Sequence, residues 1–168
     1  YLELQAAKQD LSAQNRYLEE KVRERSKELQ KSYEATIGCL ASLAETRDPE
    51  TGNHIQRTRY YVKAIAEYLR DLPRFSSYID EKYIHILFSS TALHDVGKVG
   101  IPDYILLKPG KLTPEEFEEM KQHTTYGRNT LLNAEKSYGS SIYLNLGAEI
   151  AYSHHERWDG TGYPLGLQ

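Results

Sequence analysis

Hydrophobic side chains in the first 34 residues recur every seven positions on an otherwise polar background. The segment contains neither Gly nor Pro. A narrow apolar stripe with this spacing is typical of a helix that pairs with another helix in a coiled coil. We therefore predict a coiled-coil signalling and dimerisation helix over residues 1–34. Its apolar stripe consists of Leu4, Leu11 and Leu18 at one core position, d, and of Val22 and Leu29 at the other, a.

A polar residue, Asn15, occupies one of the a positions. An asparagine buried there fixes the register of a coiled coil and favours a parallel two-stranded assembly. We therefore predict a parallel homodimer, through which a sensor or receiver domain upstream could control the rest of the chain. The alternative is a single helix that packs on its own domain. The narrow width of the apolar stripe favours dimerisation.

In the rest of the chain, apolar residues recur every three or four positions, which is the spacing of amphipathic helices. No stretch alternates with a period of two for long enough to predict a strand, so the predicted fold class is all-α. Glycines and a proline interrupt the pattern over residues 96–103, where a turn is expected. Thr113, Pro114 and Glu116 form the sequence signature of a capped helix start. Helices are predicted over residues 33–46, 53–69, 80–94, 103–107, 114–123, 127–134 and 142–155.

Composition narrows the class of protein. The chain has 168 residues and a formal net charge of -3, which argues against a DNA-binding surface but not against a small phosphate ligand. A single cysteine, Cys39, excludes an internal disulfide framework and is expected to be a buried structural thiol in a reducing compartment. No apolar run is long enough to span a membrane. The absence of an initial methionine indicates a fragment of a longer chain.

Two adjacent pairs of residues are suited to metal binding. His94 and Asp95 follow a predicted helix in ALHDVGKVGIPD. His154 and His155 end another in AYSHHERWDGTGYP. Imidazole nitrogens together with carboxylate oxygens bind iron, manganese or zinc. Neighbours on a helix point about 100° apart, so two ions would accommodate the histidine pair better than one. Lys98 follows closely enough to neutralise phosphate charge or protonate a leaving oxygen.

Two further histidines stand alone in the sequence. His54 has a carboxylate four residues earlier, Glu50, and a helical turn would place both groups on one side. His123 ends a predicted helix. A lone histidine is more often a structural or surface residue than a ligand, so both depend on what the fold brings near them. His85 keeps the structural interpretation, because it lies among apolar residues in mid-helix.

Taken together, these motifs resemble the HD-GYP branch of the HD-domain metal-dependent phosphohydrolases. HDVGKVGIPD and HHERWDGTGYP are similar to that family's two signatures almost letter for letter, and the order of the other histidines agrees. The resemblance covers about residues 33–167. It implies an all-α HD-domain helical bundle over residues 35–168, preceded by the coiled-coil helix over residues 1–34. Family members continue past the GYP motif with a helix that carries a further aspartate, so the C-terminal part of the domain is expected to be missing.

The resemblance also implies an activity. Similar proteins hydrolyse the bacterial second messenger cyclic di-GMP to the linear dinucleotide pGpG, and often onward to GMP, in the cytoplasm. They hold two or three divalent metal ions, commonly iron or manganese. Cyclic di-GMP is therefore the expected substrate, and diguanylate cyclase-type domains are expected partners. The alternative is a catalytically inactive HD-GYP-like module that docks other signalling domains. The presence of every ligand type up to residue 164 favours the enzyme.

Position by position, the resemblance implies roles for individual residues. Asp95 would bridge two metal ions and take part in catalysis. Lys98 would donate a proton or bind a phosphate of the substrate. The loop of Gly162, Tyr163 and Pro164 would shape the substrate site and contact partner domains. The expected metal ligands are Glu50, His54, His94, Asp95, His123, His154 and His155.

Overall fold

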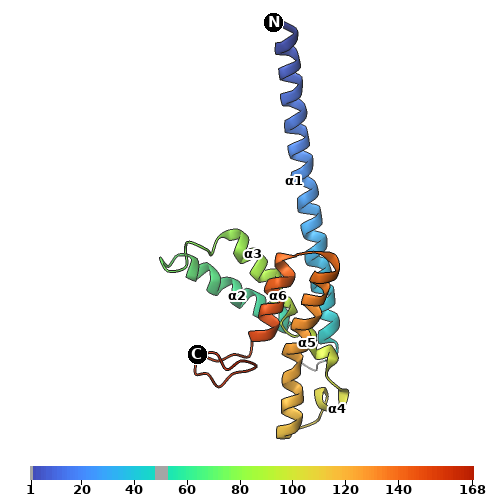
Figure 1. Cartoon of the computed structure of the whole chain (residues 1–168), viewed down its shortest axis with the longest axis vertical. Coiled ribbons are helices and arrows are strands. Elements are labelled where there is room, and N and C mark those ends of the chain that lie inside the picture. Colours follow the sequence, from blue (N-terminus) through green and yellow to red (C-terminus); the bar gives the residue numbers. More distant parts are fainter. Residues whose placement is uncertain (1, 48–52) are drawn as a thin grey trace. The chain divides into compact units, whose positions relative to one another are not determined.

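The structure is a computed structural model that describes residues 2–47 and 53–168. Within these ranges every regular element is a helix, which confirms the predicted all-α class (Figure 1). No helix in the described part of the chain is long and apolar enough to cross a membrane. The α-helices and the shorter 3-10 helices (η) are α1 (Leu2–Glu45), α2 (His54–Arg70), α3 (Glu81–Ser90), η1 (Thr91–Leu93), η2 (Val96–Gly100), α4 (Asp103–Leu106), α5 (Pro114–Tyr138) and α6 (Ile142–Ser153).

The chain divides into two compact units, Tyr1–Thr36 and Ile37–Gln168. The first unit is a stretch of α1, and its apolar stripe is open to solvent in the single chain. In a coiled coil such a stripe is covered by a second helix, so the dimer stays a prediction that the exposed stripe favours. The residues of the stripe, each more than half exposed, are Leu4, Leu11, Leu18, Val22 and Leu29.

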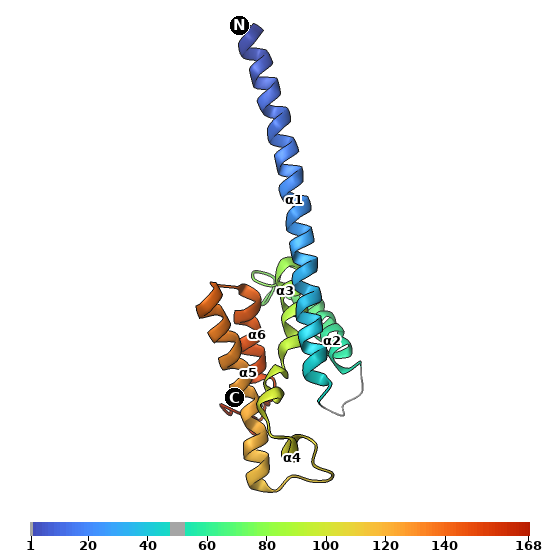
Figure 2. The same cartoon turned by 90° about the vertical axis from the view of Figure 1, so that its right-hand side faces the viewer.

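The second unit buries its core between the last turns of α1 and the helices that follow. Helix α5 packs against α6, and α6 contacts α3 (Figures 1 and 2). Ile84, Ile101 and Ile105 are fully buried, and each such side chain stabilises the fold by about 1.5–3 kcal/mol. Gly147, Ala148 and Ala151 are the buried small residues of α6, and they let its neighbours approach closely. The core thus fixes the helices that carry the histidines.

Helix α5 differs from the sequence prediction. The pattern predicts two helices, over residues 114–123 and 127–134, whereas the structure has one continuous helix, Pro114–Tyr138. Its start is the predicted capping box, in which the side chains of Thr113 and Glu116 each accept a hydrogen bond from the other's backbone N–H. His123 therefore lies in the middle of a helix and not at its end.

Gly127 lies inside this continuous helix. A glycine in mid-helix costs about 1 kcal/mol relative to alanine, and close packing accounts for it here. In the structure, a Cβ at Gly127 would lie 3.3 Å from the backbone nitrogen of Gly97 in η2. A Cβ at Gly97 would lie 1.9 Å from the carbonyl oxygen of His123. The two glycines therefore let η2 and α5 meet backbone to backbone.

The segment predicted as a helix over residues 80–94 is divided in the structure. Helix α3 ends at Ser90 and is followed by η1. The hydroxyl of Thr91 donates a hydrogen bond to the carbonyl oxygen of Leu87 at 2.7 Å, a contact that competes with the regular helical ladder. Residues 96–103, expected as a turn, begin with η2. The predicted HD pair lies between η1 and η2.

Cys39 is exposed, so the expectation of a buried thiol is wrong. The end of α1 buries a different set of side chains, namely Ile37, Ala41 and Ala44. Successive residues on a helix are about 100° apart, which places Cys39 on the side opposite Ile37 and Ala41. The apolar stretch around the cysteine is therefore only partly buried.

Candidate metal centre

Five histidines and one aspartate, all of them predicted as ligands, come together in the second unit. They lie at the start of α2, between η1 and η2, in the middle of α5 and at the end of α6. They form two groups, and within each group the ligand atoms all lie within 4.8 Å of one another. The α5–α6 group consists of Asp95, His123, His154 and His155, and the His54 group consists of His54, His94 and Asp95.

Asp95 belongs to both groups, and its two oxygens face different neighbours. Oδ1 lies 3.5 Å from Nε2 of His123 and 3.5 Å from Nε2 of His154. Oδ2 lies 3.2 Å from Nε2 of His94 and 2.9 Å from Nζ of Lys98. Among the described residues, Oδ1 is buried and has no hydrogen-bond partner. A buried carboxylate oxygen without a partner costs free energy, which a cation bound at this point would offset.

Backbone carbonyl groups fix the orientation of three of the imidazole rings. A carbonyl oxygen only accepts, so Nδ1 carries the proton in each neutral ring and Nε2 offers a lone pair. Hydrogen bonds of this kind are common behind metal-bound histidines. They run from Nδ1 to the carbonyl oxygen three residues earlier: His94 to Thr91 (2.9 Å), His123 to Met120 (2.7 Å) and His154 to Ala151 (3.1 Å).

This orientation has a consequence for the contact between two rings. Nε2 of His123 and Nε2 of His154 lie 3.3 Å apart. When Nδ1 is protonated in both neutral rings, two lone pairs face each other, and neither nitrogen donates to the other. The nearby Oδ1 of Asp95 is a third acceptor without a proton. Three convergent acceptors are the donor set that a divalent cation requires, so these residues fit a metal ion.

The local electrostatics favour the protonation states that bind metals. Burial, together with the His154 and His123 rings, lowers the pKa of His155 to about 4. Burial also lowers the pKa of His123. Burial by itself would raise the pKa of Asp95, but the neighbouring His154 and His94 rings outweigh it and the pKa is lowered. Burial by itself would lower the pKa of His94, but the hydrogen bond and the charge of Asp95 outweigh it and the pKa is raised. The centre therefore combines an ionised carboxylate with neutral imidazoles at His123 and His155 near neutral pH.

The two histidines of the pair lie close together at the end of α6. Helix α6 ends at Ser153, and His154 is its C-terminal cap. His154 keeps a helical backbone conformation, and His155 follows it in a turn. The ring centroids of His154 and His155 lie 4.1 Å apart. Both residues therefore belong to the α5–α6 group.

Two cavities border the ligand groups, and the histidine pair at the end of α6 lines both. One has a volume of about 470 Å³ and is also lined by His54 and Lys98. The other has a volume of about 560 Å³ and is lined by Lys121, Arg157 and Tyr163. Both volumes fall within the usual range for small-molecule sites. The centre is thus accessible from two sides.

Tyr163 of the predicted GYP loop lies against the metal centre. Its ring stacks on His155, with the centroids 4.6 Å apart and the planes at 22°. The ammonium group of Lys121 lies 5.5 Å from the centroid of the Tyr163 ring. Burial raises the pKa of the Tyr163 hydroxyl, and the charge of Asp95 adds to this. Tyr163 therefore presents a neutral aromatic ring to the second cavity.

Glu156 and Gly162 hold this loop in place. The carboxylate of Glu156 accepts hydrogen bonds from the backbone N–H groups of Leu165, at 2.6 Å, and Leu167, at 2.9 Å. A Cβ at Gly162 would lie 2.3 Å from the backbone nitrogen of Arg157, so the two ends of the loop meet only because this residue is glycine. The bond between Tyr163 and Pro164 is cis.

Not every predicted residue joins the centre. Glu50 lies outside the described residues. His85 belongs to neither ligand group in the described part of the chain, as its mid-helix position predicted. Sequence reasoning missed Lys121 and Glu156. Their positions carry no signal beyond an ordinary surface charge, and only the fold brings them to the GYP loop.

A model of the HD domain family matches residues 38–168. The chain belongs to the HD-domain family. This HD-domain chain is 50% identical over its whole length to a probable cyclic di-GMP phosphodiesterase of Vibrio cholerae, of which it covers 38%. It is 54% identical over 84% of its length to a cyclic di-GMP phosphodiesterase of the same species, of which it covers 29%. It is also 48% identical over 79% of its length to a cyclic di-GMP phosphodiesterase of Thermotoga maritima, of which it covers 32%.

The HD-domain chain thus spans between 29% and 38% of the length of these relatives. The family match and the relatives confirm the predicted membership of the HD-GYP phosphohydrolases. The HD pair that gives the family its name is His94 and Asp95 in this chain.

Proposed function

We propose that this HD domain is the catalytic part of a metal-dependent phosphodiesterase that hydrolyses cyclic di-GMP to pGpG, with GMP as a further product. Three similar proteins carry the name of cyclic di-GMP phosphodiesterases. The two ligand groups supply imidazole and carboxylate donors of the kind that hydrolytic metal centres use. Both findings support an enzyme over the alternative, an inactive docking module.

The position of Asp95 is the observation that carries the proposal. Oδ1 of Asp95 faces the α5–α6 group, whereas Oδ2 faces His94 in the other group. We therefore assign Asp95 as the bridging ligand. Mixed nitrogen and oxygen donors suit iron or manganese, and we propose two or three such divalent ions. The proposed ligands are His54, His94, Asp95, His123, His154 and His155, together with Glu50 from the sequence resemblance.

Metal ions, when bound, would activate water and stabilise the charge that develops at phosphorus. Lys98 is placed to assist, because its Nζ lies 2.9 Å from Asp95 and the side chain lines the 470 Å³ cavity. There it would neutralise a phosphate oxygen and donate a proton to the departing 3′ oxygen. Water oxygen forms a new bond to phosphorus as the bond to the 3′ oxygen breaks. The opened product keeps its 5′ phosphate, as in pGpG.

The two cavities suggest how a ligand with two nucleosides would lie across the centre. Gly162 and Tyr163 line the 560 Å³ cavity, so we assign the loop of Gly162, Tyr163 and Pro164 to the substrate side. The Tyr163 ring would contact a base, because aromatic faces stack on nucleobases. Lys121 lies at the same cavity and would add a positive charge near the phosphates.

The proposal is tested by turnover in the full-length protein supplied with Mn²⁺ or Fe²⁺. We expect chromatography to show that cyclic di-GMP yields pGpG. We expect Asp95→Asn and His94→Ala to lower the rate of hydrolysis at least about 100-fold, because loss of a residue that merely orients a metal ligand already lowers activity by about 10–100-fold. His85→Gln is the matched control, because His85 lies outside both groups, and it is expected to keep the wild-type rate. Turnover that survives in both Asp95→Asn and His94→Ala would contradict the proposal. Tight binding of the dinucleotide without any product would favour the docking module.

We also propose that residues 1–34 form a parallel homodimer that connects the HD domain to an upstream sensor or receiver domain. The exposed apolar stripe of α1 supports this assignment. Diguanylate cyclase-type domains remain the proposed further partners, on the strength of the sequence resemblance. The dimer can be tested independently of the chemistry.

A further inference from the structure

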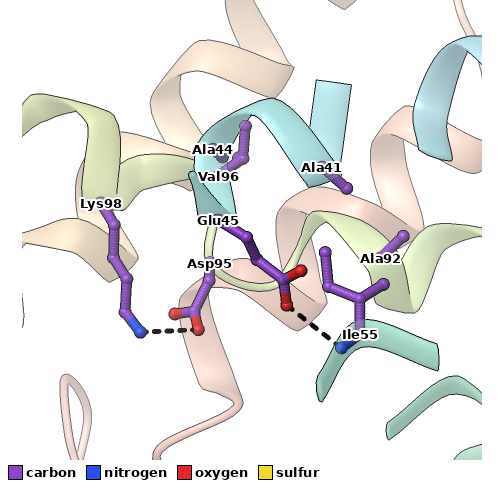
Figure 3. A pocket seen from close by; sticks show the side chains of 8 residues that line it. All are labelled: Ala41, Ala44, Glu45, Ile55, Ala92, Asp95, Val96 and Lys98. Atoms are coloured by element: carbon purple, nitrogen blue, oxygen red, sulfur yellow. Dashed lines mark hydrogen bonds and ion pairs between the residues drawn. The ribbon is translucent and has the colours of Figure 1, made fainter. Parts of the chain in front are cut away.

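The last turn of α1 packs directly behind the HD pair. Ala41, Ala44 and Glu45 line a narrow void of about 10 Å³ together with Asp95 and Lys98 (Figure 3). Ala41 and Ala44 are buried, so the helix approaches this point without long side chains in between. A void of this size has room for about one water molecule. The end of α1 and the residues that follow Asp95 are therefore in tight contact.

Glu45 links this turn to the helix that carries His54. Its Oε1 accepts a hydrogen bond from the backbone N–H of Ile55 at 3.1 Å (Figure 3). Within the described residues, the N-cap residue of α2, Asn53, makes no side-chain capping bond, and the first turn of α2 has no acidic residue. The free amides at a helix start favour an anionic acceptor. Glu45 supplies it from another helix, one residue away from His54.

Arg47, just after the end of α1, contacts η2 and the residues that follow it, on the Lys98 side of the His54 group. Its guanidinium donates hydrogen bonds to the carbonyl oxygens of Val99 and Ile101 and pairs with Asp103. Val99 lies in η2, next to Lys98, whose ammonium contacts Asp95. A planar guanidinium with several donors holds such a set of acceptors in a defined geometry, which a lysine cannot reproduce.

We propose that Glu45 and Arg47 are positioning residues that set the separation between His54 on one side and Asp95 with Lys98 on the other. This inference rests on the proposed metal centre and concerns the His54 group in particular. Glu45 acts through the start of α2, and Arg47 acts through η2. Neither side chain is a ligand in this proposal. Residues that orient ligands typically change metal affinity by about 10–100-fold when they are removed.

The experiment is a Mn²⁺ titration of the full-length protein, followed through the electron paramagnetic resonance signal of free Mn²⁺. We expect Glu45→Ala to weaken one of the bound Mn²⁺ ions by about 10–100-fold and to leave the ion of the α5–α6 group in place. Glu45→Gln is expected to restore most of the affinity, because an amide oxygen can still accept from the Ile55 N–H. Arg47→Lys is expected to weaken the same ion.

Arg70→Ala is the matched control, because it removes an ion pair of 2.8 Å with Glu81 at the opposite end of α2. It is expected to leave both Mn²⁺ affinities unchanged. Wild-type Mn²⁺ affinities in Glu45→Ala, with only a lowered melting temperature, would overturn the inference. If Glu45→Ala does not fold, Arg47→Lys decides in the same way. A wild-type protein that binds no Mn²⁺ would contradict the proposed metal centre itself.

Discussion

At the scale of single residues, the metal centre depends on two kinds of position: those that offer ligand atoms and those that allow backbones to meet. Asp95 is of the first kind, since its two oxygens face different ligand groups. Gly97 is of the second kind, because the carbonyl oxygen of His123 occupies the space where its side chain would be. The separation between Asp95 and His123 is therefore set by a glycine that has no chemistry of its own.

We predict that Gly97→Ala lowers the free energy of unfolding by at least about 2 kcal/mol, because the new methyl group would meet rigid backbone and force η2 away from α5. Gly38→Ala is the matched control: among the described residues nothing lies within 4 Å of the added carbon, and Gly38 lies inside α1. It is expected to raise stability by up to about 1 kcal/mol. Urea unfolding of both variants measures the difference, and equal effects would contradict the proposed backbone contact.

Some of these residues could be recognised from the sequence and others could not. His94 and Asp95 were recognisable because they are adjacent and followed by glycines. Their meeting with His123 required the fold, since α5 brings a residue from a distant part of the chain. Glu45 and Arg47 carried no local signal, because a charged residue at the end of a helix is ordinary. Their role depends on what the next helices place opposite them.

At the scale of elements, the start of α5 is the part whose stability follows most directly from local sequence. We predict that Thr113→Ala lowers the free energy of unfolding by about 1 kcal/mol, because it removes the acceptor for the Glu116 N–H. Thermal or urea unfolding at neutral pH measures the loss. Ser137→Ala serves as the control, since its hydroxyl donates a hydrogen bond to the carbonyl oxygen of Asn133 at the other end of the same helix. An equal loss of unfolding free energy in Ser137→Ala would contradict a specific stabilising role for the Thr113 cap.

The same cap gives a pH dependence. Hydrogen bonds from Lys108 and from the Thr113 N–H lower the pKa of Glu116 below its ordinary value of 4.5. A carboxyl group with a lowered pKa in the folded state stabilises the fold above its unfolded pKa, and this contribution is lost as the pH falls through the folded value. We therefore expect wild type to exceed Glu116→Gln in stability at neutral pH, and the gap to close below pH 4.5. A gap that is independent of pH would contradict this role for the carboxylate.

Helix boundaries show the limit of local pattern. The capping box correctly marked where α5 begins. Its length was underestimated because the pattern predicted a break between residues 123 and 127, whereas the helix is continuous and Gly127 packs closely against Gly97. The division of the segment before His94 was missed for a similar reason. Thr91 bonds to the preceding turn, and hydrophobic periodicity does not register such a bond.

At the scale of the whole molecule, the dimer is the prediction with the widest consequence. Replacing Asn15 with Leu removes the polar residue from the a position, so we expect Asn15→Leu to tighten self-association and to admit higher oligomers. Arg16→Leu adds the same apolar side chain beside the stripe and is expected to leave the oligomeric state unchanged. Sedimentation equilibrium measures both. A monomeric wild-type protein would exclude the coiled-coil dimer.

The all-α class was predictable from the helical periodicity of apolar residues, and the family was predictable from the order of the motifs. Both survive small errors in helix boundaries. The arrangement of ligand atoms was not predictable in the same way. The expectation that two ions accommodate His154 and His155 better than one assumed a helix that continues to residue 155, whereas α6 ends at Ser153. The predicted helix extended two residues too far, so helical spacing did not predict how close the two rings lie.

The three imidazoles held by carbonyl oxygens have one more consequence. Each ring is oriented by a carbonyl three residues earlier in its own segment, as with His94 and Thr91. A carbonyl group is present whatever side chain the residue bears, so the main chain orients these three rings. The side chains of Thr91, Met120 and Ala151 can therefore change without removing the acceptors that orient these rings.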